Sequence, residues 1–168
     1  MTAIIPAKAI TRAEQSDSIV VSFGVEWRQH LLAKGFSIVI RRRVPKLSSF
    51  KWLYVHINRP LSAICARAPI TEIFKATPNE AVALAKQINL TPAEIRSYFG
   101  RRTSIGCYRL GPFEFSSEPV SAAKLATRLV YNPPQSFFIV SKKAKVVIDQ
   151  FAGFNTSRNA HSHEESSL

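Results

Sequence analysis

The stretch Ser37-Ile38-Val39-Ile40-Arg41-Arg42-Arg43 joins an apolar run to three consecutive arginines. Ser, Ile and Val favour an extended backbone here, so the run predicts a strand that leaves a core with a dense positive cluster at its end. Adjacent guanidinium groups repel one another, and a folded domain tolerates them where an anion lies opposite, because each can donate two parallel hydrogen bonds to phosphate or carboxylate. A solvated strand end is the alternative interpretation.

The net charge of the whole chain favours an anionic ligand opposite the arginines over a solvated strand end. The 168 residues are enough for one domain with a sizeable core, and they carry 23 Lys and Arg against 11 Asp and Glu, a net charge of +12. Residues 152–168 hold only Arg158, Glu164 and Glu165, so the basic charge lies in the rest of the chain. A compact basic domain is typical of nucleic-acid binders, with an anionic membrane surface or an acidic protein partner as the less common explanations.

Metal, cofactor and membrane functions have little support in the sequence. Cys65 and Cys107 stand too far apart for a metal spacing and are expected to be reduced core residues, and His161 and His163 lie in a polar terminus where solvation is expected. We therefore expect no cofactor and no metal. No stretch approaches the roughly 20 apolar residues that span a bilayer, and the N-terminus lacks a signal-peptide pattern, so we expect a cytoplasmic protein.

The order of the elements predicts an α+β domain over residues 18–151, with mobile tails at 1–17 and 152–168. Thr77-Pro78-Asn79-Glu80 and Thr91-Pro92-Ala93-Glu94 are capping boxes that begin helices, the second running to about Phe99. Further helices are expected at 25–34 and 120–129, and 142–151 fits a strand or a helix. Strands are expected at 18–23, 37–43, 51–57, 62–67, 70–74, 104–110, 113–115 and 135–140, with a bulge or an edge at Pro69.

Several of these segments resemble, in order and spacing, those of the ASCH domains of the PUA-like superfamily. The strings that carry the resemblance are 34–43, 53–60, 63–66, the helix 91–100 with Tyr98, and Pro133-Pro134-Gln135-Ser136-Phe137. The resemblance covers about residues 19–140. It implies a mostly antiparallel PUA-like β-barrel with short flanking helices.

The enzymatic branch of that family resembles amidohydrolases acting on acylated cytidine, and it implies a catalytic lysine and a carboxylate. Phe36 stands at the expected lysine position and Val39 at the expected glutamate position, so the proton-transfer pair is missing. A rearranged pair of Lys34 and Glu72 stays open. Catalysis is therefore not the leading hypothesis.

The leading hypothesis is a nucleic-acid-binding module that holds a nucleotide or a phosphate backbone in a basic cleft, with RNA favoured over DNA by the family analogy. We expect Arg41, Arg43, Arg59 and Arg101 to share one positive surface. The predicted binding residues are Arg41, Arg42, Arg43, Lys46, Lys51, Asn58, Arg59, Arg101 and Arg102. An enzyme for a modified nucleoside and an adaptor for an acidic protein are the alternatives.

Three residues on the next strand have two readings each. Trp52 and Tyr54 could stack on bases beside Lys51, but residues two apart on a strand share a face, so they are expected mainly to fill the core. His56 is expected to be a hydrogen-bonded core residue rather than a base.

Overall fold

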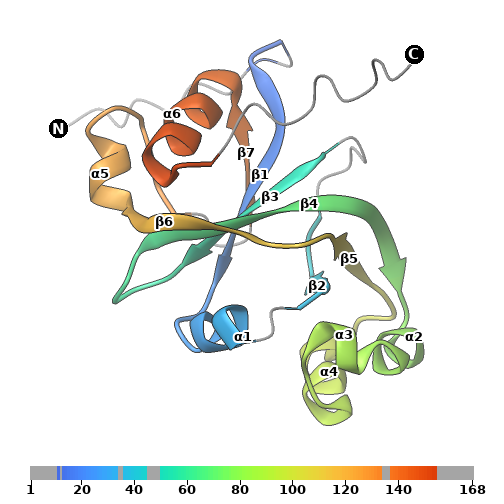
Figure 1. Cartoon of the computed structure of the whole chain (residues 1–168). Coiled ribbons are helices and arrows are strands. Elements are labelled where there is room, and N and C mark those ends of the chain that lie inside the picture. Colours follow the sequence, from blue (N-terminus) through green and yellow to red (C-terminus); the bar gives the residue numbers. More distant parts are fainter. Residues whose placement is uncertain (1–10, 12, 34–35, 45–49, 134–136, 155–168) are drawn as a thin grey trace, which may run out of the picture.

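The computed structural model describes residues 11, 13–33, 36–44, 50–133 and 137–154. Figure 1 shows a curved sheet with helices on both sides. The strands are β1 (Gln15–Phe23), β2 (Ile38–Arg41), β3 (Trp52–Ile57), β4 (Ala63–Ala76), β5 (Ile105–Leu110), β6 (Glu114–Ser121) and β7 (Phe137–Ser141). The helices are α1 (Trp27–Ala33), α2 (Pro78–Ala83), α3 (Ala85–Ile88), α4 (Pro92–Phe99), α5 (Ala122–Ala126) and α6 (Lys142–Ala152).

The sheet has the strand order β2-β5-β4-β3-β1-β7, and β6 pairs with β4 off this path. The pair β1–β3 is parallel, and the other described pairs are antiparallel. The predicted mostly antiparallel α+β fold with short helices is thus confirmed. A closed barrel is not, because β2 and β7 end the order of the described strands without pairing with each other.

The long strand β4 holds the two halves of the sheet together. Its first half pairs with β3 and β6, and its second half pairs with β5, with an irregular register between Ile70 and Glu72. Pro69 lies just before this point, and its carbonyl accepts from the backbone N–H of Gly111 at 2.8 Å. The sequence predicted two strands broken at Pro69, whereas the chain keeps one strand that changes partners there.

Both predicted capping boxes are present. Thr77 and Thr91 each accept from the backbone N–H of the glutamate three residues on, and Glu80 and Glu94 each accept from the backbone N–H of the threonine. These caps satisfy amides that a helix start leaves free, so the local sequence sets where α2 and α4 begin.

The helices cover opposite faces of the sheet (Figure 1). One face packs against α1, and beside it α2, α3 and α4 cover β2 and β5; the other face packs against α5 and α6. The alternating strands therefore bury both sets of side chains. The cysteines Cys65 and Cys107 are free and buried, as expected.

The domain limits differ in detail from the prediction. β1 begins at Gln15, inside the range predicted as a tail, and Phe154 is buried beyond the predicted domain end. Residues 1–10, 12 and 155–168 of the predicted tails, which include His161 and His163, lie outside the described residues. Segment 142–151 is a helix. None of the described helices has the length and apolar content needed to cross a membrane.

Candidate functional site

A pocket of about 260 Å³ lies along the outer edge of β2, and it is called the β2 pocket below. It is bounded by α1 on one side and by α3 and α4 on the other. Its aromatic wall consists of Phe23, Trp27 and Phe36, with the two rings Phe23 and Phe36 5.4 Å apart. The other lining residues are Ile38, Val39, Ile40, Arg41, Ile88, Leu90, Glu94 and Tyr98.

The pocket faces the backbone of β2 as well as its side chains. Four consecutive residues line it, although successive side chains of a strand point to opposite faces, so the pocket lies at the strand's edge. The Leu110 N–H donates to the Ser37 carbonyl at 2.8 Å, on the β5 side. In an antiparallel ladder every second residue directs its backbone N–H and C=O toward the partner strand. Since Ser37 bonds to β5, the N–H and C=O groups of Ile38 and Ile40 point away from β5. The pocket therefore offers main-chain donors and acceptors beside an apolar wall.

Arg41 closes one end of this pocket. Its side chain donates to the Ser22 carbonyl at 2.9 Å and to the Ile40 carbonyl at 2.8 Å, and it lies 4.3 Å from the ring centre of Phe23. Arg41 thus spans the gap between the ends of β2 and β1. Burial lowers the pKa of its guanidinium, and the nearby Tyr98 and Tyr108 act in the opposite direction. An arginine nonetheless stays charged at neutral pH.

Arg42 ties the end of β2 to the end of α4. Its Nη2 donates to the Tyr98 carbonyl at 3.1 Å, and its backbone N–H donates to the Tyr98 hydroxyl at 3.2 Å. Arg43 is exposed and makes no hydrogen bond or ion pair with the described part of the chain. Arg101 and Arg102 are exposed in the turn that follows α4. The arginine rim, meaning Arg42, Arg43, Arg101 and Arg102, therefore gathers where β2 and α4 end beside the pocket.

Glu94 and Tyr98 bring polar chemistry to the pocket from α4. Hydrogen bonds from the backbone N–H of Thr91 and from its hydroxyl lower the pKa of Glu94, which is therefore an anionic acceptor at neutral pH. Sequence reasoning read Glu94 only as a cap. The spacing of Glu94 and Tyr98, four residues apart on a helix, was the signal that they share a face.

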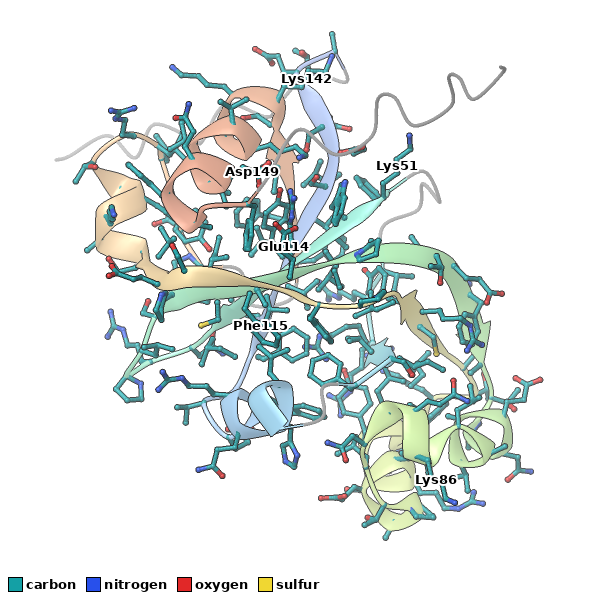
Figure 2. The ribbon with its side chains drawn as sticks, in the orientation of Figure 1. Lys51, Lys86, Glu114, Phe115, Lys142 and Asp149 are labelled. Carbon is teal, nitrogen blue, oxygen red and sulfur yellow. The ribbon has the colours of Figure 1, made fainter. Side chains whose placement is uncertain are left out.

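The other predicted binding residues are spread more widely. Asn58 and Arg59 lie in the exposed β3–β4 turn, and the Asn58 N–H donates to the Phe23 carbonyl at 2.8 Å, so this turn adjoins the strand end under Arg41. Lys51 precedes β3, at the opposite end of that strand, and lies far from Lys86 of α3 in Figure 2. Lys46 lies outside the described residues.

The positions linked to catalysis by the resemblance are in the pocket but carry no proton-transfer group. Phe36 and Val39 both line it. Lys34 lies outside the described residues. Glu72 is not among the lining residues, and its carboxylate accepts from Arg109 at 3.0 Å. The carboxylate that does line the pocket is that of Glu94.

The expectations for β3 hold. Tyr54 is fully buried on the α6 face, and Trp52 is half-buried with the Arg67 guanidinium 4.4 Å from its ring centre, so neither forms an open stacking surface. His56 is fully buried, and its Nδ1 lies 2.9 Å from the Tyr131 hydroxyl. Both predicted core assignments are therefore correct.

A buried ion cluster anchors α6 to the face of the sheet on which Tyr54 lies. Asp149 lies 3.3 Å from Arg67 and 2.9 Å from Lys145, and it accepts a hydrogen bond from Tyr54. Glu114 lies 2.7 Å from Arg67. These groups pair with one another, so the cluster serves the packing of α6 against the sheet.

The sequence matches no protein-family model and no curated protein. The structure, in contrast, is similar to the crystal structure of an ASCH protein from Zymomonas mobilis, with a TM-score of 0.70 and 20% identity over 80% of this chain and 94% of that chain. A serine-to-alanine mutant of that protein gives a TM-score of 0.73 at 17% identity, covering 82% of this chain and 97% of that chain. Its tyrosine-to-phenylalanine mutant gives 0.70 at 19%, covering 80% and 98%. The chain therefore has the fold of the ASCH-domain proteins.

Proposed function

We propose that this protein binds single-stranded nucleic acid, with one unstacked nucleobase in the β2 pocket and the adjoining phosphates against the arginine rim. One observation carries the proposal: the aromatic-walled pocket opens along the same strand that ends in the arginine cluster. An apolar slot and a set of free cations are thus next to each other, as a nucleotide requires.

The shape and chemistry of the pocket suit a base. About 260 Å³ is at or below the low end of the roughly 300–1,000 Å³ typical of small-molecule clefts, which favours a compact, flat ligand. Phe23, Trp27 and Phe36 supply ring surfaces, and single-strand binders use such rings because every base has a π-face. The outward peptide groups of β2 and the Glu94 carboxylate supply hydrogen-bonding partners for a base edge.

The arginine rim suits the phosphates. Arg43, Arg101 and Arg102 are exposed and unpaired within the described residues, so they are free to contact an anion. Arg41 has a different role, because its hydrogen bonds to two carbonyls already hold it in place. It positions the pocket wall rather than a phosphate. RNA is favoured over DNA by the resemblance to the ASCH domains.

Fluorescence anisotropy with labelled single-stranded RNA and DNA tests the proposal. Replacing Arg43 and Arg101 with alanine should weaken binding similarly for unrelated sequences, and should flatten the plot of log K against log salt by about 0.7 for each lost contact. The matched control is Lys143→Ala, which removes an exposed cation from α6 on the other face of the sheet.

Three outcomes would contradict the proposal. The wild type could bind neither nucleic acid at low salt, the double variant could bind as tightly as the wild type, or the control could weaken binding equally. Hydrolysis of an acylated nucleoside without oligonucleotide binding would favour the enzymatic alternative. Capture of an acidic protein without oligonucleotide binding would favour the adaptor.

A further inference from the structure

A chain of aromatic rings leads out of the β2 pocket toward β6. Phe36, in the pocket wall, contacts Phe113 with ring centres 5.2 Å apart and nearly perpendicular planes. Phe113 in turn lies 6.3 Å from Phe115, with an angle of 36° between the planes. The last ring of this chain, Phe115, lies at the protein surface.

Phe115 is the exposed end of this chain. It is 47% exposed, and among the large hydrophobic residues exposed in the described ranges it is the one with an aromatic ring. Its neighbour Glu114 points to the opposite face of the sheet, where it pairs with Arg67. Figure 2 shows Glu114 on the α6 side of β6 and Phe115 on the α1 side, which is the side of the pocket.

Helix α1, which carries Arg28, lies on the side of the sheet where Phe115 is exposed. Phe115 pairs with Ala66 on β4, next to Cys65. Burial raises the pKa of the Cys65 thiol, and Arg28 of α1 is close enough to act in the opposite direction. Arg28 is exposed and has no ion-pair partner among the described residues. An exposed ring and a free guanidinium on one side of the sheet match the two halves of a nucleotide, the base and the phosphate.

A structural role explains Phe115 poorly. A core phenylalanine gains stability by leaving water, and this one leaves about half of its surface in water. Its ring contact is with Phe113 alone among the described residues.

We propose that Phe115 is a stacking platform for a second base, one that flanks the base in the β2 pocket on the same strand, with Arg28 on the adjoining phosphate. This inference rests on the proposed function and extends it, because it gives the bound nucleic acid a path from the β2 pocket across Phe113 to β6. The occupant is a nucleobase of single-stranded nucleic acid.

The test separates the second base from the first by ligand length. Affinities of nucleoside monophosphates and of random-sequence RNA of three, five and ten nucleotides are compared for the wild type and Phe115→Ala. Stacking is worth about 1–3 kcal/mol per base, so the variant should bind the longer RNAs at least about fivefold more weakly. Its affinity for the monophosphates should not change, because these reach the pocket alone.

Two further variants define the contact. Phe115→Trp should keep the wild-type affinity, whereas Phe115→Leu, which is apolar but has no ring, should behave like Phe115→Ala. Val146→Ala is the matched control, since it truncates another exposed apolar side chain on α6, across the sheet. Thermal melting of each variant establishes that it is folded.

The outcomes distinguish this inference from the proposed function. If the wild type binds no RNA or DNA, the proposed function fails and takes the second base with it. If the wild type binds RNA and Phe115→Ala binds every length equally well, the second base alone is wrong. An equal loss for monophosphates and long RNA, or wild-type behaviour of Phe115→Leu, would assign Phe115 to packing and also overturn the inference.

Discussion

The buried pair of His56 and Tyr131 should make the stability of this protein depend on pH. His56 is fully buried, and its Nε2 has no hydrogen-bond partner among the described residues. The Nδ1 lies 2.9 Å from the Tyr131 hydroxyl, and Ser22 occupies the paired position on β1. A proton on this ring would place an uncompensated charge in the core. Replacing both His56 and Tyr131 with phenylalanine removes the titrating imidazole and the hydroxyl that contacts it.

The structure sets the size of the effect. Burial lowers the pKa of His56 from 6.5 to about 4, so the folded ring is neutral where the unfolded ring is protonated. The contribution of His56 to stability is complete above the unfolded pKa and is lost as the pH falls from 6.5 to 4. One proton over two and a half pH units corresponds to about 3 kcal/mol, or up to about 1.4 kcal/mol per unit.

Urea unfolding followed by tryptophan fluorescence measures this between pH 4 and pH 7.5. Asp and Glu residues titrate in both proteins, so the difference in unfolding free energy between wild type and double variant isolates His56. We expect the wild type to lose about 3 kcal/mol relative to the variant on going from pH 7 to pH 4. His56→Gln, which is neutral at every pH, provides the same comparison. A difference that stays constant with pH would refute the reasoning.

Two further predictions concern packing. A Cβ on Gly106, which pairs with Arg41, would collide with the Val44 side chain, so Gly106→Ala should lower the free energy of unfolding by about 1–3 kcal/mol, and adding Val44→Ala should relieve part of that loss. Wild-type stability of Gly106→Ala in urea would show that the clash is absent. Asp149→Leu should cost about 3–5 kcal/mol because it leaves the Arg67 charge without one of its buried partners, whereas Lys145→Met should cost about 1 kcal/mol or less. Equal losses in thermal melting would contradict this ranking.

Local signals predicted the elements of the fold because their causes are local. The capping boxes at Thr77 and Thr91 and the helix stop at Gly100 act within one turn, and the sequence located them correctly. The partner change of β4 near Pro69 depends on where β3, β5 and β6 lie, so a single strand was read as two. Closure of the sheet is likewise a tertiary property, and the open gap between β2 and β7 could not be read from strand order.

The sequence indicates the basic charge of the candidate site and predicts a cleft, but it does not indicate which residues line the pocket. The arginine cluster is visible in the sequence because its residues are consecutive. The β2 pocket is formed by residues of α1, β2, α3 and α4. Helix packing already accounts for Trp27 and helix capping for Glu94, so neither residue indicates a pocket in the sequence. Arg41 was expected to face an anion, but only the structure shows that the Ser22 carbonyl already holds its guanidinium.

The anchoring of α6 by Asp149 has a consequence for the order in which the protein can fold during synthesis. Arg67 lies in the first half of β4, between β3 and β6, yet Asp149 leaves the ribosome after every described strand. A nascent chain that ends at β7 lacks Asp149, and the α6 face of its sheet, including Tyr54, Val140 and the Arg67 guanidinium, is open to water. Such a chain therefore has all the described strands but lacks the contacts of α6 that stabilise the sheet. We expect the domain to reach its full stability only after α6 has packed.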